Sequence, residues 1–435
     1  MLRRFFILLL LLSFYPGWTG TAQTSRPVAI HCGRLIDARF DQPLPGATIV
    51  IQNERITAVG QNVAIPAGAQ VIDLGQATCL PGLMDLHAHI LFDQKASAAQ
   101  NYLNRSSARK AFDGLLNAQK MLRAGFTTLR DPGDFDAYYA LVEIRDAIAR
   151  GGFIGPRLQV APHCITSTGG HADINDLAAD HAVHAFGKLA NSPDEMRKAV
   201  REQIKYGADW IKLMASGGVM SMKDDPRVQG FTDEELRAAV DETHRHGKKI
   251  TAHAHGAGAI KSAVRAGVDS VEHGTLIDDE GIALMKGRGT YLVPTLYVLN
   301  YILEEGAKQG IPEENIAKGR SMQIERDQNI RKAFAAGVKV AFGSDTIFPH
   351  EQAAREFALL VKLGLTPMQA IRAATINAAE LLGLDKELGT IETGKRADII
   401  AVAENPLDNI RTLEAVKFVM KDGRVVKNEF TPPIR

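Results

Sequence analysis

The sequence is poor in cysteine and carries no marked excess of charge of either sign. Its three cysteines stand at positions 32, 79 and 164, and none belongs to a C-x-x-C pair. An odd, widely spaced set is not a disulfide framework, although one bridge stays open, and a cysteine-based zinc site is not indicated. Lys and Arg number 51 against 50 for Asp and Glu, so the basic excess typical of nucleic-acid-binding proteins is absent.

Long hydrophobic runs are also absent, apart from one at the N-terminus. Two arginines at positions 3 and 4 precede the almost wholly apolar residues 5–14, and the small residues Gly20-Thr21-Ala22 follow. This order is that of a secretory signal peptide, and the run is too short to span a bilayer, which takes about 20 residues. We therefore expect residues 1–22 to be a signal peptide and the mature chain to be secreted or periplasmic, with no membrane span.

Both ends of the mature chain show the pattern of short β-strands. Residues 48–51 and 56–59 are apolar and flank a polar turn, which predicts a hairpin. Near the C-terminus, apolar runs at 397–402 and 416–420 precede Asp422-Gly423, a pair that favours a tight hairpin. The simplest arrangement is one small β-sandwich built from residues 23–80 and 376–435. A larger domain, residues 81–375, is inserted between its two parts.

Helix and strand patterns alternate through this inserted domain. A helix, a glycine and an apolar strand recur in that order, and the glycines are Gly125, Gly207, Gly247, Gly267, Gly289 and Gly337. Glycine just after a helix can close its last turn, and Ser192, Thr232 and Thr366 each begin a capping box that marks a helix start. The eight strands expected from this pattern lie near residues 80–90, 126–131, 157–164, 210–216, 249–256, 270–274, 291–297 and 339–346.

Eight strands alternating with helices predict an α/β fold with a parallel sheet, most simply a closed (β/α)8 TIM-type barrel. The rival is an open doubly wound sheet, but no G-x-G-x-x-G motif opens a helix after the first strand. We therefore expect a barrel with a small composite β-sandwich domain formed from both termini. Residues 166–192 have little periodicity and are long for a loop, which is typical of a functional lid.

Side chains that can bind metal stand at the carboxyl ends of five expected strands, where barrel enzymes place their chemistry. They are His87 and His89 in strand 1, Lys212 in strand 4, His253 and His255 in strand 5, His273 in strand 6 and Asp345 in strand 8. Taken singly, each has a structural explanation, such as a satisfied histidine, an ion-paired lysine or an aspartate in a turn. Their shared position at one end of the barrel favours a metal centre.

The ligand types indicate zinc, and more than one ion. Imidazole and carboxylate suit Zn²⁺, and the histidines with Asp345 and Lys212 exceed what one tetrahedral ion needs. A lysine becomes a ligand when its amine adds CO₂, because the resulting carbamate can bridge two cations as a carboxylate does. We therefore expect two Zn²⁺ ions bridged by carboxylated Lys212, a pair that can generate hydroxide near neutral pH.

In these residues the sequence resembles the amidohydrolase superfamily. The matching segments are Pro81-Gly82-Leu83-Met84-Asp85-Leu86-His87-Ala88-His89, Lys212, His253, His273, Gly343-Ser344-Asp345 and residues 389–398. Within the superfamily, the chain is similar to the zinc-dependent dipeptidase branch, which includes the imidazolonepropionase-like Xaa-Pro and Xaa-Arg dipeptidases and ochratoxinase. The segments that carry this closer resemblance are residues 211–219, 252–256 and 168–171. The resemblance covers nearly the whole mature chain.

The resemblance implies a role for each ligand. One zinc ion would be held by His87, His89 and Asp345. The other would be held by His253 and His273, with carboxylated Lys212 as the bridge. Asp345 would also act as general base and acid, because a ligand on strand 8 can take a proton from water and pass it to the leaving amine.

Three further residues are expected to contact the substrate. His255 shares a strand face with His253 and lies nearer the rim, His171 lies in the lid-like segment, and Tyr297 ends strand 7. No arginine stands out as a clamp for a substrate carboxylate, and Arg227 is one candidate.

The activity that the resemblance implies is hydrolysis of a C–N amide bond. Expected substrates are dipeptides or N-acyl amino acids with a free C-terminal carboxylate, and ochratoxin A, an aryl amide of phenylalanine, has that form. Two alternatives stay open, a mononuclear deaminase or cyclic-amide hydrolase on the same barrel and a non-catalytic periplasmic metal- or ligand-binding protein. The number of zinc ions per chain distinguishes the first alternative from a binuclear enzyme. Absence of turnover by the metal-loaded protein would favour the second alternative. Whether the chain forms a homo-oligomer is left open.

Overall fold

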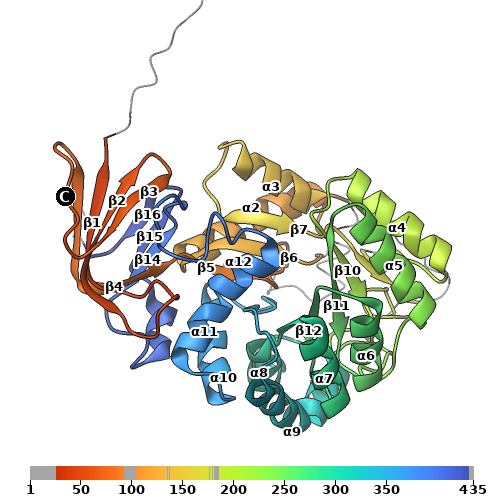
Figure 1. The fold of residues 1–435 in the computed structure, drawn as a ribbon. Helices are drawn as coiled ribbons and strands as arrows, with labels where there is room; N and C mark the ends of the chain where they lie inside the picture. The colour runs from red at the N-terminus through yellow and green to blue at the C-terminus, as the bar shows by residue number, and fades with distance from the viewer. Residues whose placement is uncertain are drawn as a thin grey trace, which may run out of the picture.

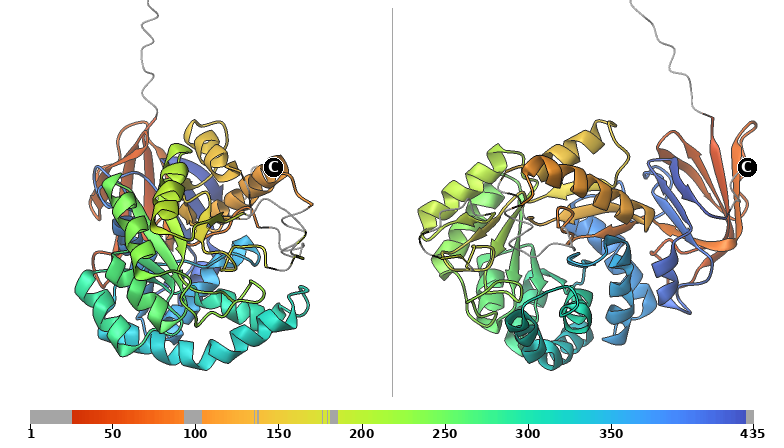
Figure 2. Two further views of the ribbon diagram at one scale, coloured as in Figure 1. Left: turned by 90° about the vertical axis from the view of Figure 1, so that its right-hand side faces the viewer. Right: turned by 180° about the vertical axis from the view of Figure 1, so that it is seen from behind.

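A computed structural model describes residues 26–92, 104–134, 136, 138–175, 177–178, 180 and 186–430. The expected signal peptide, residues 1–22, lies outside these residues. A β domain built from both ends of the chain stands beside a barrel of parallel strands with helices outside (Figure 1). The rear view shows the same two bodies, with the β domain at one flank of the barrel (Figure 2, right).

The barrel follows the predicted alternation of strands and helices. Most of its parallel strands pair in chain order, except that β8 lies between β10 and β9. Strand β7 meets β10 where the Asp209 amide donates to the Val160 carbonyl at 2.9 Å. The strands are β5 (Leu83–Asp85), β6 (Phe126–Asp131), β7 (Arg157–Val160), β8 (Cys164–Thr166), β9 (Lys188–Leu189), β10 (Trp210–Met214), β11 (Lys249–Ala254), β12 (Ser270–His273) and β13 (Tyr291–Val293).

The eighth strand closes the ring through only a few bonds. Val340 forms a parallel bridge with Leu292, and the Ala341 amide donates to the Leu292 carbonyl at 3.0 Å. On the other side the Leu86 amide donates to the Phe342 carbonyl at 2.9 Å. The expected strand at 339–346 is thus much shorter than predicted, and its last residues form the loop that carries Asp345.

Two other expected strands also differ from the structure. The run predicted at 157–164 is divided into β7 and β8. The run predicted at 291–297 ends at Val293, because Thr295 adopts a left-handed φ of 46° and helix α8 begins at Leu296. The prediction that Tyr297 ends a strand is therefore wrong, and Tyr297 lies in the first turn of α8.

Helices cover the outside of the barrel. Thr232 and Thr366 form complete capping boxes, as predicted. At Ser192 the hydroxyl caps the helix, but the Glu195 carboxylate accepts from the Asn191 amide instead. The helices are α2 (Ser107–Arg123), α3 (Ala140–Ala149), α4 (Pro193–Lys205), α5 (Asp233–Arg245), α6 (Ala257–Ala266), α7 (Asp279–Arg288), α8 (Leu296–Glu305), α9 (Glu313–Ala336), η1 (His350–Arg355), α10 (Glu356–Lys362), α11 (Pro367–Ala373), α12 (Ile376–Leu382) and η2 (Ile410–Ala415).

Within the described residues, the β domain is one seven-stranded sheet in the order β16-β15-β14-β4-β1-β2-β3. Side chains from both ends of the chain fill a shared apolar core that includes Ile49, Ile399 and Phe418. Cys32 and Cys79 form a disulfide within this core. The strands are β1 (Val28–Leu35), β2 (Leu44–Gln52), β3 (Arg55–Gly60), β4 (Gln70–Pro81), β14 (Ile399–Val402), β15 (Phe418–Lys421) and β16 (Arg424–Asn428).

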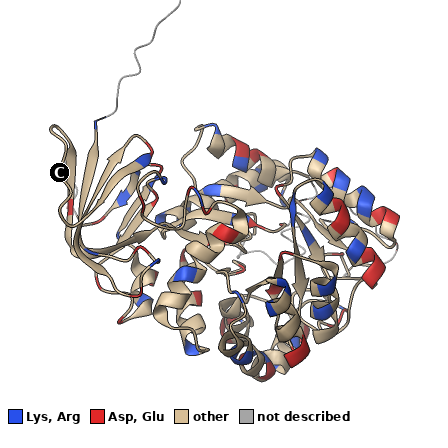
Figure 3. Ribbon diagram, viewed as in Figure 1, with Lys and Arg blue, Asp and Glu red and all other residues tan. Residues whose placement is uncertain are grey.

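The two bodies are joined closely. Strand β4 ends at Pro81 and β5 of the barrel begins at Leu83. Helix α12, which the sequence-based division places with the β domain, packs its leucines and alanines with Met84, Leu86 and Val293 of the barrel. In the described part of the chain, no helix is long and apolar enough to cross a membrane. Acidic and basic side chains are interspersed on the outer helices (Figure 3), in keeping with the balanced charge.

Candidate metal centre and pocket

The first potential metal-binding group lies where β5 and the eighth strand end. It consists of His87, His89 and Asp345, whose ligand atoms all lie within 4.8 Å of one another. Asp345 Oδ1 is 3.1 Å from His89 Nε2 and 3.9 Å from His87 Nε2. Burial acts to raise the pKa of Asp345, but His87 and His89 outweigh it and hold that pKa well below its usual range. The carboxylate therefore stays ionised.

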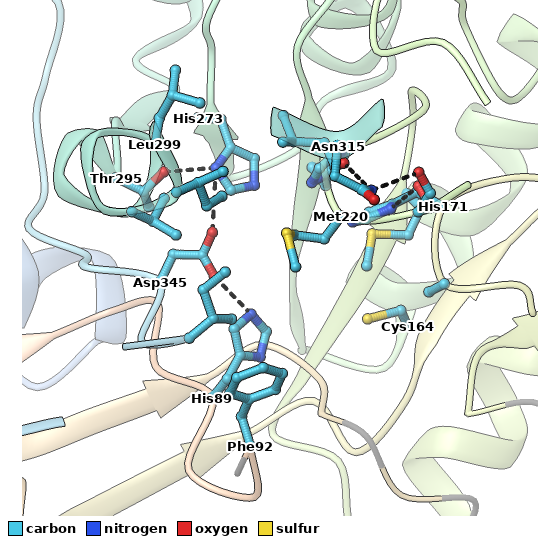
Figure 4. Close-up of a pocket in the computed structure, with 18 of the residues that line it drawn as sticks. His89, Phe92, Cys164, His171, Met220, His273, Thr295, Leu299, Asn315 and Asp345 are labelled. Carbon is cyan, nitrogen blue, oxygen red and sulfur yellow. Dashed lines mark hydrogen bonds and ion pairs between the residues drawn. The ribbon is translucent and has the colours of Figure 1, made fainter. Parts of the chain in front are cut away.

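The second group lies beside the first and comprises His253, His255 and His273. The His253 and His273 rings are 4.5 Å apart, and Asp345 Oδ2 lies 4.0 Å from His273 Nδ1. Asp345 therefore stands between His89 and His273, as Figure 4 shows. Burial lowers the pKa of all three imidazoles, so the rings are neutral and can offer lone pairs to a cation.

Lys212 occupies the middle of β10 and is buried. Burial lowers the pKa of its amine. Within the described part of the chain it forms no hydrogen bond or ion pair. A buried amine without such a partner is costly, and its conversion to an anionic carbamate next to two cations would remove that cost. The ligand types and this lysine therefore fit a two-zinc centre.

A buried carboxylate that the sequence analysis missed supports His87. Glu272 Oε2 lies 2.7 Å from His87 Nδ1, while Arg130 donates to Oε1 at 2.6 Å. Burial alone would raise the pKa of Glu272, but Arg130 and His87 hold it well below its usual range. Because the carboxylate accepts the Nδ1 proton, His87 presents Nε2 to the centre. The sequence does carry a signal for this pair, because Arg130 and Glu272 are charged residues that each lie within a buried strand.

Asp85 holds the Asp345 loop in place. Its carboxylate accepts hydrogen bonds from the Ser344 hydroxyl and from the Ser344 amide at 3.1 Å, and the Asp345 amide donates to the His87 carbonyl at 2.6 Å. Burial raises the pKa of Asp85 to about 7. A side chain at Gly343 would collide with His87, since its Cβ would lie 2.8 Å from the His87 Cβ. Strand 8 can therefore approach strand 1 only with glycine there.

Backbone strain gathers at the ends of three successive strands. His273, Thr295 and Asp345 have φ values of 69°, 46° and 56°, in the left-handed region that residues other than glycine rarely adopt. The Thr295 hydroxyl lies 2.6 Å from His273 Nδ1, so two of the strained residues bind each other. Such outliers cluster at functional sites, where surrounding contacts compensate their cost.

The three predicted substrate contacts have different places. His255 and His171 both line the pocket. His255 is a member of the second metal-binding group, and its Nδ1 lies 2.6 Å from the Thr275 hydroxyl. Tyr297 is not among the described residues that line the pocket, because its hydroxyl lies on the far side with Gln352 and Arg355. Its helix neighbour Tyr301 lines the pocket instead. The carboxylate-clamp candidate Arg227 also lies away from the pocket and is paired with Glu325.

The pocket itself is largely apolar and has a volume of about 290 Å³. The histidines, Lys212 and Asp345 form its floor. Its walls come from the segments after β5, β8 and β10 and from helices α8 and α9, and they include Phe92, Phe186, Met220, Leu299, Ile302 and Ile311. This combination of polar floor and apolar walls suits a small organic molecule with a reactive polar bond.

Comparison with known proteins decides the family. The model of the amidohydrolase family matches residues 78–426. The chain belongs to this family. Ochratoxinase from Aspergillus niger is 33% identical over 425 residues, which cover 92% of this chain and 86% of that protein. The family is metal-dependent. Because the chain belongs to it and is similar to ochratoxinase over most of its length, the chain is a hydrolase that acts on amide bonds.

Solved structures agree with this placement. A Xaa-Pro dipeptidase with methionine bound in its active site superposes with a TM-score of 0.87 and 38% identity, over 92% of this chain and all of that chain. A prolidase complexed with N-methylphosphonate-L-proline superposes with a TM-score of 0.86 and 31% identity, over 93% of this chain and all of that chain. The dipeptidase-like branch expected from the sequence is confirmed.

Proposed function

We propose that this chain is a binuclear zinc amidohydrolase that cleaves dipeptides or N-acyl amino acids with a free C-terminal carboxylate. The observation that carries the proposal is the position of Asp345 between the pair His87 and His89 and the group of neutral histidines around His273. His87, His89 and Asp345 would hold one ion, and His253 and His273 the other, with carboxylated Lys212 as the bridge. His255, grouped with the second set in the structure, remains our candidate for substrate contact. Bound zinc would polarise the scissile carbonyl and lower the pKa of water.

The residues of this chain supply the proton transfers. Asp345 is held ionised and can accept a proton from water, then deliver it to the amine that leaves. Asp85 and Ser344 fix the loop that carries it, so the carboxylate is positioned before substrate arrives. Glu272 orients the His87 ring through its Nδ1, and Arg130 holds the Glu272 carboxylate in place. The apolar walls exclude water from the substrate's side groups, which favours substrates such as Xaa-Phe, Xaa-Pro or ochratoxin-type amides.

A hydrolysis panel tests the proposal. Zinc-loaded protein would be assayed against Xaa-Pro, Xaa-Arg, Xaa-Phe and ochratoxin-type amides, with zinc per chain measured on the same sample. We expect turnover of at least one class and two zinc ions per chain. One zinc ion together with deamination or cyclic-amide hydrolysis would favour the mononuclear alternative. Two ions without any turnover would favour a binding protein.

We also propose that the mature protein is secreted or periplasmic. The N-terminal pattern of residues 1–22 supports export, and the Cys32–Cys79 disulfide supports an oxidising compartment, since such bonds are rare in reducing ones. N-terminal sequencing of the exported protein should begin at Gln23. A cytosolic protein that retains Met1 would contradict the proposal.

A further inference from the structure

Three segments of the chain meet at one side of the pocket through connected hydrogen bonds. His171 comes from the segment after β8, and its Nδ1 lies 2.6 Å from the Ser221 hydroxyl in the segment after β10. The Ser221 hydroxyl donates to Asp224 Oδ2 at 2.5 Å. Lys318 of helix α9 donates to Asp224 Oδ1 at 2.9 Å. Figure 4 shows His171 at the pocket with Met220 and Asn315 close to it.

The number of protons fixes the direction of these bonds. A serine hydroxyl has one proton, and an ionised carboxylate can only accept. The Asp224 carboxylate is held by Lys318, so the Ser221 proton points to it and the Ser221 oxygen must accept from His171. His171 is then protonated at Nδ1, and Nε2 is the only ring nitrogen left for the pocket.

Close packing fixes the plane of the same ring. The His171 ring stacks on His253 with centroids 4.5 Å apart. On another side lies Gly218, where a Cβ would stand 2.3 Å from His171 Nδ1. The Gly218 amide also donates to Asp224 Oδ2 at 2.9 Å. The ring therefore fits only because residue 218 has no side chain.

Helix α9 holds the segment after β10 at its far side. The Asn315 amide group donates to the Val219 carbonyl at 2.6 Å, and Lys318 donates to the Ser221 carbonyl at 2.9 Å. Asn315 is buried. These contacts make Ser221 part of a fixed support, so its hold on His171 does not depend on an exposed loop.

We propose that Ser221 and Asp224 are positioning residues that fix the tautomer and orientation of His171, so that Nε2 faces the substrate. The kinetic consequence rests on the proposed hydrolase function, whereas the structural consequence does not. Without Ser221, both the ring and the segment that carries it should lose their fixed place beside His253.

The kinetic test uses the panel substrate that is hydrolysed fastest. Ser221→Ala should lower kcat/KM about tenfold, and Ser221→Thr, which keeps the hydroxyl, should restore most of it. Ser321→Ala, on the exposed face of α9, is the matched control and should change nothing. In a His171→Ala background, Ser221→Ala should have no further effect. A full additional tenfold loss there would overturn the proposal.

Hydrogen–deuterium exchange gives a readout that needs no activity. Ser221→Ala and Asp224→Asn should increase exchange in peptides covering residues 167–175, whereas Ser221→Thr and Ser321→Ala should not. Unchanged exchange in Ser221→Ala would overturn the proposal even if the protein is folded and binds zinc. If no panel substrate is hydrolysed, the proposed function fails, and the exchange result alone decides the role of Ser221.

Discussion

The Glu272 carboxylate lies directly against His87, with Oε2 2.7 Å from His87 Nδ1 and both side chains excluded from solvent. Its other oxygen receives Arg130 at 2.6 Å, and the Arg130 guanidinium packs over the Trp210 ring at 4.6 Å. The metal centre therefore rests on a buried ion pair. Such a pair must remain complete, because removal of one partner leaves an uncompensated charge.

Glu272→Gln should weaken zinc binding by about 10- to 100-fold, because His87 loses the carboxylate that orients it. It should also lower the free energy of unfolding by about 3–5 kcal/mol, because Arg130 is left buried without its partner. Chelator competition and urea unfolding measure the two effects. Glu280→Gln, at an exposed glutamate paired with Lys261, is the control. Wild-type zinc affinity in Glu272→Gln would contradict the role assigned to Glu272.

Asp345→Asn should remove hydrolysis while leaving the protein folded, since the amide keeps the shape of the side chain but cannot accept a proton. We expect kcat to fall by at least about 100-fold, the lower range for loss of a general base. Circular dichroism checks the fold, and Asp194→Asn on the outer surface of α4 should retain full activity. Turnover retained in Asp345→Asn would exclude it as the base.

Lys212→Ala should lower bound zinc from two ions per chain towards one, because the bridging carbamate cannot form. Metal analysis after dialysis measures the ratio. Lys261→Ala, at a surface lysine paired with Asp278, should leave it unchanged. Two tightly held ions in Lys212→Ala would show that no lysine bridge is needed.

Tyr297→Phe should leave KM unchanged within twofold, because the hydroxyl bonds to Arg355 outside the pocket. The same substitution should cost about 1 kcal/mol of unfolding free energy through that lost bond. Tyr301→Ala, which opens the pocket wall, should raise KM. A large change of KM in Tyr297→Phe would instead support the substrate contact that the sequence predicts for Tyr297.

Reduction of the Cys32–Cys79 disulfide should destabilise the protein. The bond closes a segment of 47 residues, for which the loss of chain entropy in the unfolded state amounts to about 4 kcal/mol. The Cys32→Ser/Cys79→Ser double variant should therefore unfold at lower urea concentration than the oxidised wild type. Cys164→Ser, at the buried free cysteine, should not respond to reductant differently from wild type. Equal midpoints with and without reductant would rule out a stabilising bond.

The barrel and the gathering of the candidate ligands at one of its ends could be predicted because both leave local signals. Glycines after helices and caps before them separate the strands, and imidazoles inside apolar strands are conspicuous. Tyr297 was misplaced because the left-handed turn at Thr295 has no signal in its residue type. The predicted eighth strand is longer than the observed one, because an apolar run of residues does not show where the hydrogen bonds of a strand end.

Interactions between distant segments could not be read from the sequence. Glu272 and Arg130 lie on different strands, and the residues around each of them do not indicate that the two side chains form an ion pair. The same holds for the cysteines, since their pairing follows from β1 lying beside β4 with Leu35 opposite Cys79. Ser221 and Asp224 look like ordinary turn residues until His171, fifty positions earlier in the chain, is placed against them.

Strand β4 links the first part of the chain to the last. It pairs with β1 along one edge and, over Thr78–Pro81, with β14 along the other, then leads within two residues into the first barrel strand. A chain that ends before residue 399 thus lacks β14 and leaves one edge of β4 unpaired where β4 leads into the barrel. Such an edge recruits other chains. The last strands of the chain therefore cover an edge of β4 that would otherwise be open to pairing with another chain.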